Sequence, residues 1–301
     1  MRCFKVSVSA RLGIVAFAAM LGWSATGRSD TTVPAAQIFS CGSDFTAFEF
    51  RVSSHGNVNA LIGPAPALPN HINGSLTGYQ VCYATGAGGP FFTSFDEGAV
   101  ESGWLSGVAV SQPNGPGTFP LEITRNTADG RVRITRRFTG NSFVAPVPTG
   151  NALDLNGNGQ ACDTLAECGN CTNRTLHVLT RVTNLTSSNL FNVGFVEKVD
   201  FNVGGVTANR FGRTTDSVVA YADISEDPAH PYAALLQTLV LPASTGVLAA
   251  DSYGFPADCA VSSLTTPTAI GNFEGILGQA FGTLSPGANT GNSIRVHYRR
   301  F

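Results

Sequence analysis

The sequence predicts an all-β protein, an antiparallel β-sandwich of the large two-sheet or supersandwich type with long loops rich in glycine and proline. Composition is the first reason, because 34 glycines, 16 prolines and 20 phenylalanines suit strands joined by turns. The second reason is that several short segments alternate apolar and polar residues, as a strand with one buried face requires. Roughly ten such segments separated by turns favour a sandwich.

The N-terminus, residues 1–28, has the pattern of a secretory signal peptide. Three basic residues lie among the first eleven, an apolar run spans Leu12–Trp23, and small residues follow. The uncharged run is shorter than the ~20 residues that a membrane-spanning helix needs, and no second run of that length follows. We therefore expect a secreted protein (periplasmic, cell-surface or extracellular) with no transmembrane segment once the signal is removed.

After the signal, residues 29–44 are interpreted as a linker and residues 45–301 as a single β-sandwich domain. The domain opens at Phe45–Val52, where Phe48, Phe50 and Val52 alternate with polar residues. Further strands are predicted from the same alternation and from the turn residues around them. They lie at Asn57–Ile62, Gly78–Ala84, Ser217–Ala222, Leu235–Leu241 and Ile294–Tyr298.

The clearest alternation runs through Thr172–Val203, which we interpret as a β-hairpin with its polar turn at Asn184–Asn189. In the first arm Leu176, Val178 and Val182 share a face with Thr180, and His177 and Arg181 take the other face. In the second arm one face carries Phe191, Val193, Phe195, Val199, Phe201 and Val203, and the other carries Asn192, Lys198, Asp200 and Asn202.

Glu197 breaks this pattern, because it occupies an apolar position between Phe195 and Val199. Either a β-bulge turns its side chain outward, or a carboxylate lies in the core, where it would need a partner and would have a raised pKa. Since extra residues commonly redirect a side chain, we favour the bulge.

A second hairpin is predicted around the turn Asn126–Gly130, with Leu121 and Ile123 on one arm and Val132 and Ile134 on the other. Its polar face is basic. If the two hairpins adjoin, the combined face could line a groove for an acidic polysaccharide; the alternative is a solvated face balanced by acids such as Glu122 and Asp200. The basic residues are Arg131, Arg133 and Arg137, together with His177 and Arg181.

Three segments, Ile123–Phe138, Thr180–Phe211 and Leu277–Asn289, carry a resemblance to a known group of proteins. The chain resembles uncharacterised exported bacterial β-sandwich proteins of the supersandwich kind, also seen in mutarotase-like and polysaccharide-lyase modules. The motifs are strand and turn patterns covering about two-thirds of the chain after the signal. The resemblance implies the fold and carries over no catalytic residue.

The segment beginning at Asp154 matches the opening D-x-N-x-N-G of a calcium loop, in which alternate side chains supply oxygens and Gly159 permits the bend. An EF-hand would place Glu where this chain has Leu165, so Asp163 or Glu167 would have to substitute. The alternative is an ordinary Asn-Gly turn. The predicted calcium ligands are Asp154, Asn156, Asn158, Gln160 and Asp163.

Of the seven cysteines, Cys3 lies in the signal, which leaves an even number for disulfides in an exported protein. Cys162, Cys168 and Cys171 are close together, so we expect a short-range bridge there. The rival interpretation is a zinc site formed by Cys168, Cys171 and His177, although a second CxxC is missing. The candidates for disulfides are Cys41, Cys82, Cys162, Cys168, Cys171 and Cys259.

A segment rich in glycine and aromatic residues precedes the second hairpin, and its carboxylates are the candidates for catalysis. Aromatic rings beside paired carboxylates are typical of a sugar-cleaving site, although such rings also close the end of a sandwich core. The rings are Phe91, Phe92, Phe95 and Trp104; the alternative catalytic residues are Asp96, Glu97, Glu101 and His177.

Charge and the missing motifs exclude several classes of function. A formal net charge of -2 argues against a nucleic-acid partner, and common hydrolase, protease and nucleotide motifs are missing. We expect an exported binding or structural module for a glycan or a cell-surface protein, with Trp104, Arg133 and Arg181 as ligand-binding candidates. The alternative is a carbohydrate-active enzyme, a polysaccharide lyase or a hydrolase.

Overall fold

The structure is a computed structural model. The residues it describes are 34–40, 48–62, 70–98, 100–115, 119–140, 175–203, 209–213, 216–222, 232–239, 244–249, 255–256, 258–259 and 273–300. Within these ranges no helix is long and apolar enough to cross a membrane. The predicted signal peptide and the predicted calcium loop, Asp154–Asp163, lie outside the described residues. Residues 34–40, which we had assigned to the linker, instead form strand β1.

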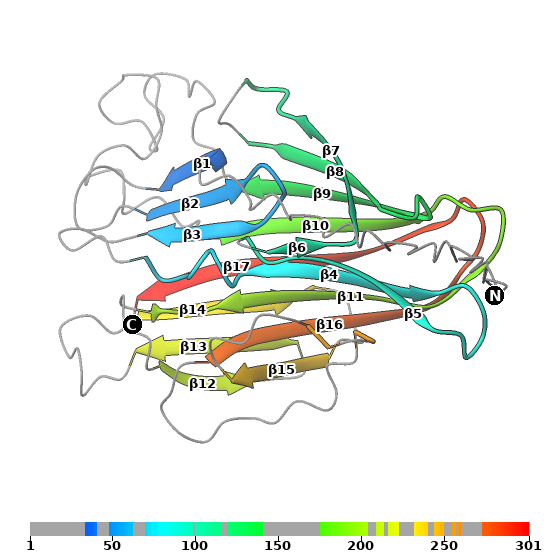
Figure 1. The fold of residues 1–301 in the computed structure, drawn as a ribbon. Coiled ribbons are helices and arrows are strands. Elements are labelled where there is room, and N and C mark those ends of the chain that lie inside the picture. Colours follow the sequence, from blue (N-terminus) through cyan, green and yellow to red (C-terminus); the bar gives the residue numbers. More distant parts are fainter. Residues whose placement is uncertain are drawn as a thin grey trace, which may run out of the picture.

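The described chain is made of antiparallel strands in three sheets, which confirms the predicted β-sandwich (Figure 1). The eight-stranded sheet has the order β12 (Asn209–Arg213), β13 (Ser217–Ala222), β14 (Tyr232–Thr238), β17 (Asn289–Arg300), β10 (Thr175–Asn184), β9 (Val132–Gly140), β8 (Leu121–Thr127) and β7 (Trp104–Ser111). The six-stranded sheet has the order β15 (Ser244–Ala249), β16 (Phe273–Leu284), β11 (Leu190–Asp200), β4 (Gly78–Ala84), β5 (Phe91–Asp96) and β6 (Glu101–Ser102). The third sheet contains β1 (Pro34–Ser40), β2 (Phe48–Ser53) and β3 (Val58–Ile62).

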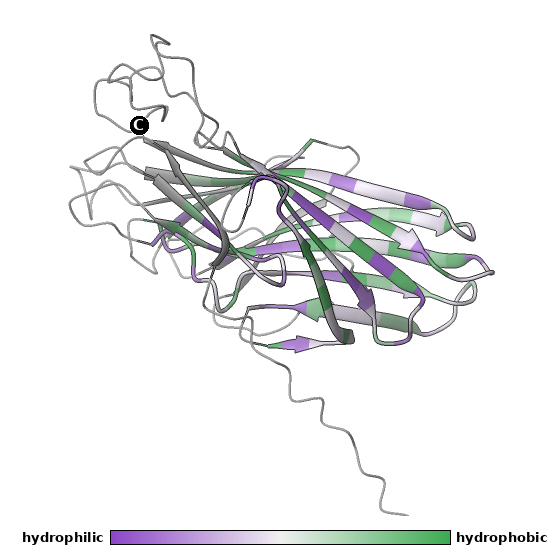
Figure 2. Cartoon of the chain, turned by 90° about the horizontal axis from the view of Figure 1, so that it is seen from above, coloured by the Kyte–Doolittle hydropathy of each residue, from purple (hydrophilic) through white to green (hydrophobic). Residues whose placement is uncertain are grey.

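The eight-stranded sheet forms one layer, and the other two sheets cover its inner face. Apolar side chains of β8–β10 pack against β2 and β3 in one part of the core, where Phe50, Leu121 and Phe138 meet. In another part they pack against β4 and β11, where Tyr79, Ile134 and Phe195 meet. Figure 2 shows polar and apolar residues alternating along the strands, which is the pattern that identified them in the sequence.

The predicted hairpin over Thr172–Val203 is wrong in one respect, since its two arms lie in different sheets. β10 pairs with β9 and β17, whereas β11 pairs with β16 and β4. The connection is therefore an arch across the core. β16 and β17 form a second arch beside it. The side-chain amide of Asn184 holds the two arches together, because it donates to the carbonyls of Ser188 (2.8 Å) and Leu284 (2.9 Å).

The prediction that a bulge turns Glu197 outward is also wrong. Glu197 is 1% exposed, and the pairing of β11 with β16 and with β4 is regular on both sides of it. The irregularity lies earlier in the strand, between Leu190 and Gly194, where Asn192 has a φ of 50°. A partner in the facing sheet makes the inward carboxylate tolerable: Arg136 donates to both of its oxygens at 2.7 and 2.8 Å.

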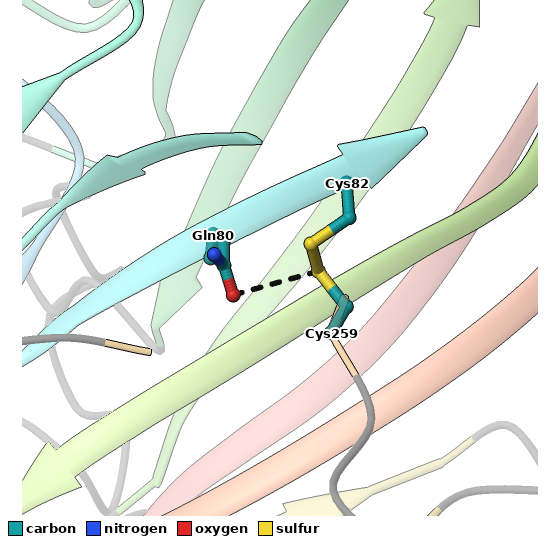
Figure 3. Close-up of a disulfide and its surroundings, with 3 residues drawn as sticks. All are labelled: Gln80, Cys82 and Cys259. Atoms are coloured by element: carbon teal, nitrogen blue, oxygen red, sulfur yellow. Dashed lines mark hydrogen bonds between the residues drawn. A yellow bond between two sulfur atoms is a disulfide. The ribbon is translucent and has the colours of Figure 1, made fainter. Parts of the chain in front are cut away.

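Two of the six candidate cysteines form a disulfide, Cys82–Cys259, which links β4 to a segment 177 residues further along the chain (Figure 3). Gln80 Oε1 lies 3.5 Å from the Cys259 sulfur. The other four cysteines, and with them the expected short-range bridge and the zinc alternative, fall outside the described residues.

Candidate functional site

The second predicted hairpin, β8–β9, is confirmed, and it adjoins β10 in the eight-stranded sheet. The inward positions of these strands are buried and mostly apolar, so the alternate positions must face outward. Arg133, Arg137 and Arg181 all lie there and are exposed. The condition for a continuous basic face, that the two predicted hairpins adjoin, is therefore met by β9 and β10.

The register fixes which side chains surround each outward arginine. Arg133 has Asn126 and Thr183 as cross-strand neighbours. Arg181 lies between Thr135 and Gly291. Cross-strand neighbours of this kind have Cβ atoms about 5 Å apart, so they form one surface. We call this surface, defined by Arg133, Arg137 and Arg181, the arginine face.

One of the two acids that we expected to balance the arginine face lies beside it, and the other does not. Glu122 is the cross-strand neighbour of Arg137, but Asp200, the other acid we had expected to balance it, lies in the six-stranded sheet. Arg131 does not belong to the face. It lies in the β8–β9 turn, 3.2 Å from Asp129 Oδ2, with its guanidinium over the ring of Phe92.

A hollow of about 330 Å³ opens where Arg133 meets β7 and β8. It lies next to a register shift in β7, between Trp104 and Val108, which carries the edge strand away from regular pairing. Apolar, hydroxyl, amide and guanidinium groups all line it. The lining residues are Gly107, Val108, Ala109, Thr124, Asn126 and Arg133.

The four predicted catalytic residues do not form one group, because only Asp96 and Glu101 lie together. Asp96 and Glu101 point into the core, as the next paragraphs show, whereas His177 lies on the outer side of β10 between the buried Leu176 and Val178. Glu97 does not join Asp96 and Glu101, because its side chain pairs with Lys198 Nζ. Trp104, predicted to bind ligand, lies apart from the arginine face. Its ring packs over Arg125 and its Nε1 donates to the Phe95 carbonyl at 2.8 Å.

Charged and polar residues form a cross-strand row on the inner side of the six-stranded sheet. Glu197 is paired with Tyr79, Tyr79 with Asp96, and Asp96 with Glu101. Two arginines of the facing sheet meet this row at neighbouring inward positions. Arg136 binds Glu197, and Arg125 donates to both Asp96 and Glu101. All of these side chains are buried except Glu101, which is 16% exposed.

Two glycines allow the backbone conformations that bring Asp96 and Glu101 close to Arg125. Gly103 has a φ of 80° and turns the chain from β6 to β7, and a Cβ there would lie 2.6 Å from Ser94 Oγ. At Gly78 a Cβ would lie 1.8 Å from the Asp96 carbonyl oxygen, so only glycine allows β4 to approach the end of β5 this closely. The carboxylates of Asp96 and Glu101 therefore reach Arg125 from a tightly fitted corner of the sandwich.

His55, from the β2–β3 turn, completes the corner. Its Nδ1 lies 3.3 Å from Asp96 Oδ2 and 3.4 Å from Glu101 Oε2. Burial alone would raise the pKa of Asp96, but the neighbouring His55 and Arg125, with the Asn57 amide, outweigh burial and lower it. Asp96 is therefore a stable carboxylate and a poor proton donor at neutral pH.

The same three residues have the spacing of a metal site, because one ligand atom each of His55, Asp96 and Glu101 lies within 4.8 Å of the others. Their partners fit a network of salt bridges between side chains better than a metal site. The Arg125 guanidinium already binds both carboxylates, so the positive charge that a metal would bring is supplied by the protein.

Sequence analysis missed Arg125, Arg136 and His55. A signal for the two arginines was present, since each occupies an apolar phase of its strand: Arg125 follows Ile123 by two positions and Arg136 follows Ile134 by two. That is the same signal that singled out Glu197. His55 lies in a turn, where no periodicity indicates which side chains point inward.

No protein-family model matches the chain, and no curated protein matches it in sequence. Three solved structures show a similar arrangement of strands. The first is a bacterial glucoamylase complexed with acarbose, with a TM-score of 0.47 and 11% identity over 91% of this chain and 34% of that one. The second is a polysaccharide lyase, with a TM-score of 0.42 and 9% identity over 90% of this chain and 33% of that one. The third is the heparan sulfate lyase HepC from Pedobacter heparinus, with a TM-score of 0.39 and 10% identity over 88% of this chain and 37% of that one. The chain spans about a third of the length of each. At these scores the likeness assigns neither activity nor ligand.

Proposed function

We propose that this protein is an exported binding module and that its arginine face binds an anionic glycan. The observation that carries the proposal is the placement of three exposed arginines on adjacent strands, β9 and β10, beside the hollow at Arg133. Export is part of the proposal and rests on the pattern of residues 1–28.

The chemistry of the face suits a polysaccharide with carboxylate or sulfate groups. A guanidinium offers paired donors that match a carboxylate or sulfate, and it keeps its charge at every relevant pH. The lining of the hollow includes the hydroxyl of Thr124, the amide of Asn126 and the apolar side chains of Val108 and Ala109. A sugar ring presents the same mixture of hydroxyls and C–H surface, so each part of the hollow has a counterpart on the ligand.

The alternative of a carbohydrate-active enzyme has weaker support. A glycosidase needs one carboxyl group that can give up a proton and a second that can act as base or nucleophile. Here Asp96 and Glu101 are both bound to Arg125, and the pKa of Asp96 is lowered. Glu197 has a pKa raised by burial, but it is 1% exposed and bound to Arg136.

The binding proposal is tested by titrating the protein with a sulfated glycan, a polyuronate and a neutral dextran at two salt concentrations. We expect binding of the first two, weaker at high salt, and none of dextran. In Arg133→Gln/Arg181→Gln the affinity should fall about tenfold or more per arginine, since a charge-assisted hydrogen bond contributes ~1.5–3 kcal/mol. Arg131→Gln removes the same charge outside the face and should bind like the parent. Equal affinities for all three proteins would refute the proposal.

Calcium binding by Asp154, Asn156, Asn158, Gln160 and Asp163 is a separate proposal, motivated by the loop motif alone. An ion that binds only the folded loop would raise the melting temperature with increasing concentration. We expect the parent to melt higher in calcium than in chelator and Asp154→Ala to lose the difference. An identical melting midpoint for the parent in both buffers would mean that the segment forms an ordinary turn and binds no calcium.

A further inference from the structure

β9 and β10 lie side by side in the eight-stranded sheet, and together they carry a basic residue at each of four successive outward pairs (Figure 1). The basic residue lies on β9 and on β10 in turn. The pairs are Arg133 with Thr183, Thr135 with Arg181, Arg137 with Leu179, and Thr139 with His177. The three arginines are exposed and His177 is half-buried. We call Arg133, Arg181, Arg137 and His177 the cationic row.

The spacing of the cationic row follows from strand geometry. Outward positions on one strand are two residues apart, and a strand rises about 3.4 Å per residue, so successive pairs are ~7 Å apart. Four successive pairs therefore extend ~20 Å along the strands, whereas the two strands are only ~5 Å apart. A linear polymer that lies parallel to β9 and β10 would meet one cationic group at each of these steps.

Short side chains occupy the outward positions between the charges, and all of them are partly exposed. They are Thr135, Thr139 and Thr183 on these two strands and Gly291 and Ser293 on β17. Leu179, which is 44% exposed, adds apolar surface beside Arg137. Because the neighbouring side chains are short, the arginines are the groups that a polymer on this face would reach first. The hollow beside Arg133 adjoins one end of the row.

Acidic residues are scarce in the strands of this sheet. Among the residues of its eight strands, Glu122 is the only aspartate or glutamate. β17 continues the basic sequence, and its Arg295 is the cross-strand neighbour of His177. The charge of these strands therefore complements a ligand that carries negative charges at several points along its length.

The residue types favour an anionic polysaccharide over a nucleic acid. Proteins that bind single-stranded nucleic acid stack its bases on aromatic rings. The four outward pairs contain no phenylalanine, tyrosine or tryptophan. They offer guanidinium groups, which match carboxylate or sulfate groups, and threonine hydroxyls, which match the hydroxyls of a sugar.

We propose that the cationic row binds an extended anionic polysaccharide along its whole length, with the sugar chain parallel to β9 and β10. This inference rests on the proposed function, because it concerns the same arginines, and it adds the length and the direction of the ligand. A polymer held by one cation forms its next contact within the same complex, so each further contact strengthens binding. Affinity should therefore rise with the length of the glycan until the row is filled.

The test is titration of the protein with oligouronates of two, four, six and ten sugar units. In the parent, affinity should rise about tenfold or more with length and then level off once the ligand spans the row. The dependence of affinity on salt concentration should steepen over the same range of lengths, because each new ion pair releases counterions. Single-stranded DNA of matched charge should bind more weakly than the longest oligouronate.

Arg137→Gln/His177→Gln removes the two cations at the end of the row that lies away from the hollow. This variant should keep the affinity of the parent for two sugar units and lose most of the gain with length. Arg131→Gln, which lies outside the row, should keep the full gain.

Two outcomes would overturn the extended site and leave the proposed function standing. The first is an affinity of the parent that is the same at every length, while Arg133→Gln/Arg181→Gln still weakens binding. The second is a full gain with length in Arg137→Gln/His177→Gln. Failure of every oligouronate to bind, or tighter binding of the DNA, would refute both the extended site and the proposed function.

Discussion

At the scale of single residues, the notable feature is how many charges lie between the two main sheets. Arg136 and Glu197 are each 1% exposed, and the Arg136 guanidinium also packs 4.2 Å from the centre of the Tyr79 ring. A buried pair of this kind adds little net stability compared with apolar residues of the same shape, but it is costly to break. It also specifies one alignment of the two sheets, because any other alignment would leave both charges unpaired.

Arg136→Met should therefore lower the free energy of unfolding by ~3–5 kcal/mol, since Glu197 would remain buried without its cation. The double variant Arg136→Met/Glu197→Leu should recover most of that loss. Urea unfolding at pH 7 measures both. A single variant as stable as the parent would show that Glu197 is not buried as a carboxylate.

The lowered pKa of Asp96 predicts that the protein loses stability in acid. Because its folded-state pKa is lowered, the Asp96 carboxylate adds stability that is complete above its unfolded pKa of ~4 and is lost as pH falls through the folded value. Unfolding followed from pH 6 down to pH 2 should show this loss in the parent and a shallower slope in Asp96→Asn. Parallel curves for the two proteins would contradict the assignment.

At the scale of elements, two arches carry the chain from one sheet to the other. β10 leads into β11 and β16 leads into β17, and Asn184 joins the two turns through its side-chain amide. The side-chain oxygen of Asn184, Oδ1, also accepts from the Thr186 amide and hydroxyl at 2.8 Å. One buried side chain thus satisfies the backbone of two connections that are 100 residues apart in sequence.

Asn184→Ala should destabilise the protein by ~1–3 kcal/mol, because buried carbonyls would lose their donor. The neighbouring Asn189 is exposed, so Asn189→Ala is a matched control that should cost little. Thermal melting of the three proteins provides the comparison. Similar losses in both variants would mean that asparagine matters here only for the turn conformation.

At the scale of the whole molecule, the fold is held by contacts between residues distant in sequence. Cys82–Cys259 closes a loop of 177 residues and attaches Cys259 to the six-stranded sheet. Crosslinks that close long loops remove much freedom from the unfolded chain.

Cys82→Ala/Cys259→Ala should lower the free energy of unfolding by ~2–5 kcal/mol. Unfolding by urea under oxidising conditions measures this loss. A stability unchanged from the parent would contradict a stabilising role for this disulfide.

The sequence by itself determined the class of fold and the facing of many strands. Alternation in β8, β9 and β10 correctly assigned the buried apolar residues and the outward Arg133, Arg137 and Arg181, because side-chain direction in a strand is a local property with period two. It wrongly placed Arg131 on the same face, and the buried Arg125 and Arg136 were missed. Alternation also marked Glu197 as an exception, although the bulge we favoured was not the explanation.

The tertiary structure alone decided which strands pair and which charges meet. A strand with one apolar face fits a hairpin and an arch equally well, so the sequence of β10 and β11 could not show that they belong to different sheets. The partners of Glu197, Asp96 and Lys198 come from other strands, in part from the facing sheet. Ion pairing depends on distances across the core, and these are set only when the two sheets pack together.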